Sequence, residues 1–141
     1  MNNRLTKARE LSYDALIEIM DRKRLADEVA ETSILKESLQ LKRIDKGFMK
    51  EVLYGSLRWY AKILWILQKT SKRDLQKVSP EVRSALIMGA YQIFYMDRVP
   101  DRAAVNESAE YVRKKGQARA VGFVNGILRS IARRSEYFAK P

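Results

Sequence analysis

The sequence SPEVRSALIMGAYQIFYM, residues 79–96, is the segment on which the fold prediction rests. Ser79 is suited to cap a helix, Pro80 is tolerated at the first helical position, and Glu81 complements the positive end of the helix dipole. Past its first turn the segment is apolar almost all round, which is typical of a helix buried on every side. We therefore predict a central helix over about residues 80–96, with other helices packed around it.

Apolar residues recur at helical spacing through nearly all of the chain, and only six Gly and three Pro interrupt it. Val99-Pro100 marks a break after the central helix, because a residue before proline avoids helical dihedral angles. These features predict an all-α fold of about seven helices packed around the buried central one. The other expected helices cover about residues 3–23, 33–41, 45–69, 73–77, 102–115 and 118–134.

The expected helix ends rest on a few punctuating residues. Gly55 is expected to kink or interrupt the helix over 45–69. Gly116 suits the left-handed conformation that ends the helix over 102–115. The length of 141 residues fits one domain, which we expect over residues 1–134, with 135–141 as a tail or the start of a linker. The predicted capping residues are Asn3, Ser33, Asp45 and Asp101.

The composition excludes several kinds of chemistry. The chain has no Cys and no His, so it can form no disulfide, no thiolate nucleophile, no zinc finger and no Ser-His-Asp triad. Its 28 Lys and Arg exceed its 17 Asp and Glu, and the resulting charge of +11 favours a polyanionic partner. No apolar stretch is long enough to cross a bilayer and no signal-peptide core is present, so we expect a cytoplasmic protein without a membrane partner.

The positive charge is concentrated near the C-terminus, where residues 111–135 contain no acid. Such a stretch repels itself unless something anionic lies against it, and nucleic-acid phosphate is the commonest partner of this kind. The alternative is a solvated face that aids solubility. Arg4, Lys7 and Arg9 could extend a basic surface at the N-terminus. The basic residues of the acid-free stretch are Arg113, Lys114, Lys115, Arg119, Arg129, Arg133 and Arg134.

One face of the last predicted helix combines glycines with arginines. Opposite its apolar stripe lie Arg119, Gly122, Gly126, Arg129 and Arg133. Two mid-helix glycines cost about 2 kcal/mol relative to alanine, so a compensating contact is expected. A second helix packed closely against the small residues is the commoner explanation. The alternative is a nucleic-acid backbone that lies against the glycines between the arginines.

Aromatic and basic residues alternate on the outward face of the helix over 45–69, at Tyr54, Arg58, Lys62, Trp65 and Lys69. This combination suits stacking on unpaired bases and contact with phosphates. The alternative is that Tyr54 and Trp65 pack against the C-terminal helices.

Asn106, Glu107 and Asn125 are unusual because asparagine is a poor residue within a helix. We expect a structural role for them, in which Asn125 satisfies backbone groups at a nearby helix end or loop. No paired-carboxylate site and no phosphate-binding loop sequence is present.

Four segments together resemble the NusB-like domain in order and spacing: FMKEVLYGSLRW at 48–59, VP at 99–100, AVNES at 104–108 and GFVNGILR at 122–129. The resemblance covers about residues 4–134. It implies an all-helical RNA-binding unit, which occurs alone as the antitermination factor NusB. The unit also occurs as the N-terminal domain of the RsmB (Sun, Fmu) family, whose members methylate C5 of a cytosine in small-subunit ribosomal RNA.

Three of these segments resemble the methyltransferase branch in detail. The first contains Arg58-Trp59, the second has Val105 before and Ser108 after the asparagine-glutamate pair, and the last has Arg129 directly after its leucine. The resemblance then implies a non-catalytic domain, because cytosine methylation in that family needs a cysteine and a Gly-rich fold for S-adenosylmethionine. We expect no catalytic residue, metal or cofactor in this chain, and S-adenosylmethionine only in a linked methyltransferase domain.

The predicted function is to hold small-subunit ribosomal RNA for methylation, with a methyltransferase domain as partner in cis or in trans. One alternative is a free-standing antitermination factor that binds RNA and a small-subunit ribosomal protein. Another is a domain that mainly docks on a catalytic domain, through the Tyr54/Arg58/Trp65 face or the glycine face. The residues predicted to bind RNA are Arg113, Lys114, Lys115, Arg119, Arg129, Arg133, Arg4, Lys7 and Arg58.

Overall fold

The computed structural model describes residues 6–36 and 42–134, and within them it confirms the all-α prediction. No strand occurs in these two ranges. The predicted cap Asn3 and the predicted tail 135–141 lie outside the described residues. The elements are α1 (Lys7–Met20), α2 (Ala26–Lys36), α3 (Arg43–Arg58), α4 (Tyr60–Thr70), α5 (Pro80–Tyr95), α6 (Asp101–Lys114), the 3-10 turn η1 (Ala118–Ala120) and α7 (Val121–Arg133).

Helix α5 is the central helix, as predicted. The Ser79 hydroxyl caps it by accepting a hydrogen bond from the Val82 N–H at 3.2 Å. Its residues from Ala85 to Phe94 are all buried, and the helix contacts α1, α3, α4, α6 and α7. Gly89 allows α6 and α7 to approach α5 closely, because a Cβ there would overlap side chains of both helices. Burying large apolar side chains on every face of α5, at about 1.5–3 kcal/mol each, makes it the main source of core stability.

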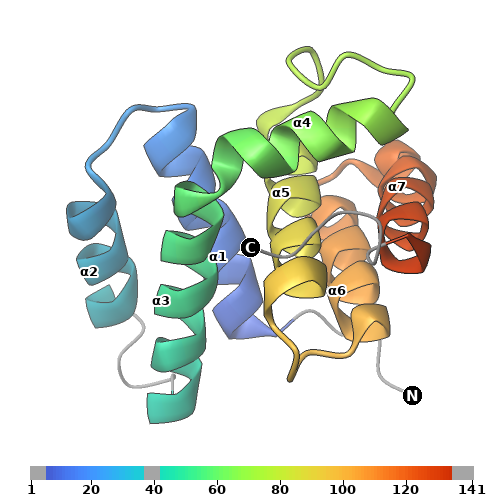
Figure 1. The fold of residues 1–141 in the computed structure, drawn as a ribbon. Helices are drawn as coiled ribbons and strands as arrows, with labels where there is room; N and C mark the ends of the chain where they lie inside the picture. The colour runs from blue at the N-terminus through green and yellow to red at the C-terminus, as the bar shows by residue number, and fades with distance from the viewer. Residues whose placement is uncertain (1–5, 37–41, 135–141) are drawn as a thin grey trace.

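The other helices surround α5 in a simple arrangement (Figure 1). Helices α1 and α3 lie on one side of it, α6 and α7 lie on the other, and α4 crosses the top of the molecule. Helix α2 packs outside this group, against α1, and buries Val29 and Ala30. The arrangement brings the C-terminal end of α4 and the loop that follows it next to α7, which becomes important for the candidate site.

Several predicted helix starts are wrong. The cap of α1 is Thr6, whose hydroxyl accepts from the Arg9 N–H at 3.4 Å. Helix α3 begins after Lys42, so Asp45 lies in its first turn, and α6 begins after Pro100, so Asp101 is its first residue. In both helices the acid lies near the positive end of the helix dipole, inside the helix. Asp is favoured there as well as at the cap, so the residue type does not distinguish the two positions.

The long predicted helix over 45–69 is two helices, and the break is at Trp59 rather than at Gly55. Trp59 leaves the helical region at φ −104° and ψ 15°, and its indole stacks on Tyr95 with ring centroids 5.7 Å apart. Gly55 stays helical and serves close packing, because a Cβ there would overlap the phenol ring of Tyr91. Gly55 therefore lets α3 pack closely against α5 and does not bend α3.

The remaining differences concern weakly patterned segments. Helix α2 begins at Ala26, before the predicted start at Ser33, and α1 ends at Met20 instead of near residue 23. The predicted helical turn over 73–77 is a non-helical loop closed by the Lys77 N–H to Asp74 carbonyl bond at 3.0 Å. The predicted last helix starts as the turn η1 before α7. Gly116 has the predicted left-handed conformation, with φ 81°.

Candidate nucleic-acid interface

The acid-free stretch divides into residues that are neutralised by α1 and residues that are not. Lys114 donates to the Glu10 carboxylate at 2.8 Å, and Lys115 lies 3.1 Å from an oxygen of Asp14. Arg113 pairs with Glu110 at 3.0 Å on the surface of α6. Three of the predicted RNA-binding residues therefore already have acidic partners within the domain, which weakens their expected contribution to phosphate binding.

Arg9 is buried, although the sequence grouped it with the exposed basic residues at the N-terminus. Its guanidinium donates to Glu107 at 2.6 Å and to the Gln92 amide oxygen at 2.6 Å, and it lies 4.9 Å from the centre of the Phe48 ring. Glu107 also accepts from the Thr6 N–H at 2.7 Å. This pair ties α1 to α5 and α6, and it gives Glu107 the structural role that was predicted for it.

Two buried tyrosines continue this polar network between α1 and α6. The Tyr13 hydroxyl lies 2.9 Å from the Ser108 hydroxyl and accepts from Gln92 at 3.2 Å. The Tyr111 hydroxyl donates to Asp14 at 2.5 Å. Burial raises the pKa of both phenols above the usual value, and for Tyr111 the bond to the Asp14 carboxylate raises it further. Both groups therefore stay neutral, and the network holds the helices together without forming a reactive site.

The arginines of η1 and α7 behave differently from those of α6. Arg119, Arg129 and Arg133 are exposed, and none forms an ion pair with another residue in the described ranges. Between them lie Gly122 and Gly126, both exposed, and a Cβ at either position would meet nothing within 4 Å. The favoured prediction, that another helix of the chain packs on these glycines, is wrong for the described residues. We call Arg119, Gly122, Gly126, Arg129 and Arg133 the α7 strip.

A groove runs between the α4–α5 loop and the α7 side of the molecule, and Arg73 lies in its middle. Three adjoining hollows of about 570, 650 and 350 Å³ all include Arg73 in their walls. The Arg73 guanidinium lies 4.6 Å from the centre of the Phe123 ring, so a cation–π contact holds it over α7. The third hollow reaches Gly122 and Gly126, so the groove opens onto the α7 strip.

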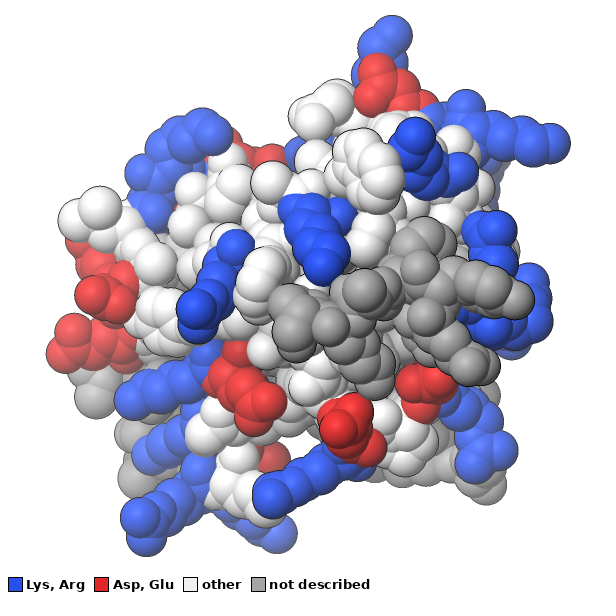
Figure 2. All heavy atoms as spheres, viewed as in Figure 1, with Lys and Arg blue, Asp and Glu red and all other residues white. Residues whose placement is uncertain are grey.

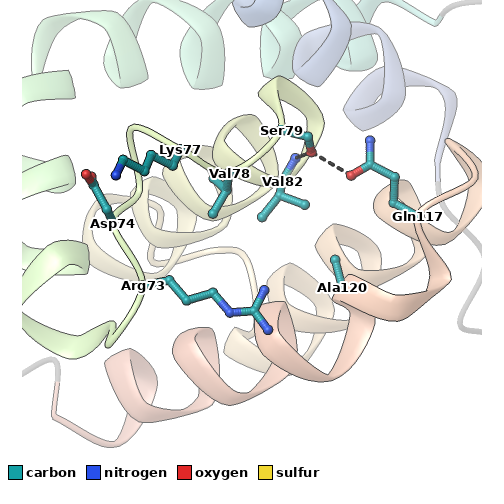
Figure 3. A pocket seen from close by; sticks show the side chains of 8 residues that line it. All are labelled: Arg73, Asp74, Lys77, Val78, Ser79, Val82, Gln117 and Ala120. Carbon is teal, nitrogen blue, oxygen red and sulfur yellow. Dashed lines mark hydrogen bonds between the residues drawn. The ribbon is translucent and has the colours of Figure 1, made fainter.

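The walls of the first hollow are drawn in Figure 3. Lys77 and Arg73 come from the loop, and Ala120 and Gln117 come from the opposite side. The Ser79 hydroxyl donates to the Gln117 amide oxygen at 2.5 Å, and the Gln117 amide donates to Glu81 at 2.8 Å, which fixes the two walls to each other. The groove is therefore preformed. Its cations along the loop and η1 are Lys72, Arg73, Lys77 and Arg119. Asp74 is the one acid among the described residues that line the three hollows.

The structure brings only some of the residues predicted to bind RNA together. Arg119, Arg129 and Arg133 lie on the α7 strip. Lys114 and Lys115 instead pair with acids of α1, and Arg113 pairs with Glu110 of α6. Lys7 is exposed at the start of α1, and Arg4 lies outside the described residues. Arg58 is exposed and lies 5.7 Å from the Trp59 ring. Sequence reasoning missed Lys72, Arg73 and Lys77. A second acid-free stretch, from Val52 to Arg73, could have indicated Lys72 and Arg73, whereas Lys77 follows Asp74 and lies outside it.

The structure does not support the alternative in which Tyr54 and Trp65 pack against the C-terminal helices. Trp65 is 61% exposed, so most of its side chain is not covered by the C-terminal helices. Tyr54 instead donates to Asp27 of α2 at 2.5 Å. The Asn125 amide oxygen is buried without a hydrogen-bond partner, so the prediction that this residue satisfies nearby backbone groups is wrong for its oxygen.

The described residues hold no cluster of three acids that could bind a metal ion. Among them, no helix is long and apolar enough to pass through a membrane.

The sequence matches the NusB family over residues 6–133. The chain belongs to the NusB family. This confirms the resemblance on which the sequence analysis relied, over nearly the whole of the chain.

Relatives of two kinds carry this NusB domain. The chain is 31% identical to a probable ribosomal RNA small subunit methyltransferase B of Bacillus subtilis, over 91% of its own length but 28% of that protein. It is 35% identical to the transcription antitermination protein NusB of Thiobacillus denitrificans, over 70% of its own length and 68% of that protein. The chain thus spans under a third of the methyltransferase and about two-thirds of the antitermination protein.

Solved structures confirm the NusB fold. The chain superposes with a TM-score of 0.80 and 19% identity on a crystal structure of the antitermination factors NusB and NusE in complex with dsRNA, covering 89% of this chain and 93% of the other. It superposes equally well on T. maritima NusB, with a TM-score of 0.80, 19% identity and coverage of 98% and 96%.

Proposed function

We propose that this NusB domain binds RNA through the Arg73 groove and the α7 strip, and that it presents small-subunit ribosomal RNA to a cytosine-C5 methyltransferase. The observation that carries the proposal is the α7 strip with its adjoining groove. Exposed helical glycines give a phosphate backbone close access to the helix, and the arginines and lysines around them lack acidic partners among the described residues. In this interpretation the contact that compensates for the two helical glycines is with RNA and not with a neighbouring helix.

The methyltransferase assignment is supported by the Bacillus subtilis relative, which aligns with 91% of this chain. The domain's own part in that reaction is binding and positioning. Cytosine methylation would need a cysteine nucleophile, and the chain has none. The described residues form no strand and no Gly-rich strand-to-helix turn, so they do not fit S-adenosylmethionine. That cofactor belongs to a methyltransferase domain, linked to this one or acting with it in the cytoplasm.

A titration of the protein with a fragment of small-subunit ribosomal RNA at low and moderate salt tests RNA binding. Affinity is expected to fall by orders of magnitude as salt rises, because each phosphate contact releases counterions. The double variant R73A/R119A should bind at least tenfold more weakly at low salt. The matched control is R22A/R24A, which removes the same charge from arginines that pair with Glu18 and do not line the groove. Absence of binding at low salt, or equal losses in both variants, would contradict the proposal.

A second candidate is supported by the Thiobacillus denitrificans relative, of which this chain covers about two-thirds. In this alternative the domain acts as a NusB-type antitermination factor that binds RNA together with a small-subunit ribosomal protein. Binding of purified NusE, measured by calorimetry with and without RNA, distinguishes the two. Tight binding of NusE favours antitermination. A reading frame that continues from Pro141 into a methyltransferase domain, together with no NusE binding, favours the methyltransferase.

A further inference from the structure

Helix α4 presents a largely exposed tryptophan, Trp65. Trp65 is 61% exposed, and the Lys69 ammonium lies 4.8 Å from the centre of the indole ring. Most of the indole surface therefore faces solvent. An aromatic ring left open in this way, beside a cation, is a feature of surfaces that bind a second molecule.

Trp65 lies within a row of cations along the outer face of α4. Lys62, Trp65 and Lys69 are spaced three and four residues apart, which places them on one side of a helix. Arg58 joins the start of this row, because Arg58 and Lys62 both lie within 5.8 Å of the Trp59 ring. We call Arg58, Lys62, Trp65 and Lys69 the α4 row.

The α4 row leads directly into the Arg73 groove. Thr70 at the end of α4, together with Lys72 and Arg73, lines the hollow that opens onto Gly122 and Gly126. No acidic residue occurs between Val52 and Arg73, so every charged residue from the row to the entrance of the groove is basic. Figure 2 shows Lys and Arg side chains over α4, with acidic side chains gathered mainly over α2 and the lower part of the same face.

The residues beside Trp65 favour RNA over a protein as its partner. Protein–protein interfaces are depleted in lysine, because its strongly hydrated ammonium is costly to bury. The flanks of Trp65 are lysines, which suit contacts to phosphates that stay partly in water. The exposed indole supplies a flat ring on which an unpaired base can stack, whatever its sequence.

We propose that an RNA strand bound in the Arg73 groove continues along the α4 row and stacks an unpaired base on Trp65, so that the domain prefers single-stranded over fully paired RNA. This inference rests on the proposed RNA-binding function and adds the conformation of the strand that is recognised. Lys69 would remain on its side of the indole, and the base would cover the exposed part. Lys62 and Arg58 would contact the phosphates that follow.

Because Trp59 and Trp65 are the two tryptophans of the chain, fluorescence can report on each alone. In Trp59→Phe, oligouridylate is expected to quench Trp65 fluorescence, and a blunt-ended RNA duplex is expected to leave it nearly unchanged. In Trp65→Phe, the remaining signal from Trp59 should change little with either RNA. Quenching of Trp65 by the duplex to the same extent as by the single strand would overturn the proposal.

Affinity measurements with Trp65→Ala provide the second arm. The loss of one stacked base should weaken binding of oligouridylate by about 5- to 150-fold and leave duplex binding within about twofold. Trp65 is exposed, so the variant should fold, and circular dichroism verifies this. The matched control is Tyr54→Ala, which removes another exposed aromatic that lies outside the row and should keep normal affinity.

The possible outcomes separate this inference from the proposed function. If the unchanged protein binds neither RNA at low salt, the proposed function fails. If it binds RNA and R73A/R119A weakens that binding, but Trp65→Ala binds oligouridylate normally, stacking on Trp65 is refuted and RNA binding stands. Normal RNA binding by Trp65→Ala combined with loss of a protein partner would identify Trp65 as a protein contact, which also overturns the inference.

Discussion

Glu107 shows how one residue can fix the relation between two distant helices. Its carboxylate receives the Thr6 N–H at the start of α1 and the Arg9 guanidinium one turn later. Gln92 of α5 binds the same guanidinium. Both charged groups are nearly buried, and a buried charge is tolerated only when it is paired and hydrogen-bonded. The asparagine-glutamate motif on α6 therefore holds the N-terminal helix in place.

Removal of the charge of Glu107 should be strongly destabilising. Glu107→Gln leaves the Arg9 guanidinium buried without its counter-charge, and breaking such a pair costs about 3–5 kcal/mol. Glu110→Gln is the control, because it breaks the exposed pair with Arg113, and such pairs contribute about 0–1 kcal/mol. Urea denaturation of both variants measures the difference. Similar losses in the two would show that the Arg9–Glu107 pair does not stabilise the fold.

The buried tyrosines predict a loss of stability in alkali. The pKa of Tyr13 and that of Tyr111 are raised in the folded protein, chiefly by burial. Their contribution is complete below about pH 10, the usual pKa of tyrosine, and declines at higher pH because only the unfolded chain can ionise them. Tyr111→Phe keeps the ring and removes the ionisable hydroxyl, so its unfolding free energy should fall less steeply above pH 10. Identical pH dependence of the two proteins would refute this role of Tyr111.

At the level of helices, the glycines fall into two groups that should respond oppositely to alanine. Gly122 and Gly126 are exposed with open space beside them, so Gly122→Ala and Gly126→Ala should each stabilise α7 by up to about 1 kcal/mol. Gly55 lies under the Tyr91 ring, so Gly55→Ala must displace that ring and should destabilise the domain. Thermal unfolding of the three variants tests this. Destabilisation by Gly122→Ala would mean that something does pack against the α7 strip.

The sequence predicted the elements whose signals are local. For α5 the cap, the proline and the apolar pattern all agree within one segment, and the structure confirms it. The break between α3 and α4 could not be placed, because it depends on how Gly55 meets Tyr91 and how Trp59 meets Tyr95, contacts between different helices. Cap positions were misjudged where an acid in the first turn resembles a cap.

The candidate site shows the same limit. The outward face of α7 follows from helical periodicity alone, and its open glycines and arginines lie on that face in the structure. The neutralisation of Lys114 by Glu10 could not be foreseen, because these residues are 104 positions apart in the chain. A basic run in a sequence indicates a polyanion site only where folding brings no acid against it.

For the whole molecule, the net charge of +11 is less informative than its arrangement. The acids of α1 neutralise Lys114 and Lys115 at the end of α6, whereas the cations of the α4–α5 loop, η1 and α7 have no acidic partner among the described residues. These elements are adjacent in space around the Arg73 groove, although residues of the groove are separated by α5 and α6 in the chain. The fold therefore brings cations from three separate segments of the chain together around the Arg73 groove.

This arrangement predicts that two triple variants of equal charge will differ in the salt dependence of RNA binding. R119A/R129A/R133A removes cations of the α7 strip, and each lost phosphate contact should lower the slope of log affinity against log salt by about 0.7 for a single strand. R113A/K114A/K115A removes the same charge from residues that already have acidic partners, so its slope should stay close to that of the unchanged protein. To compare the two slopes, affinity is measured at several salt concentrations for both variants, after each has been shown to be folded. An equal reduction of slope in both would mean that the RNA responds to total charge rather than to the α7 strip.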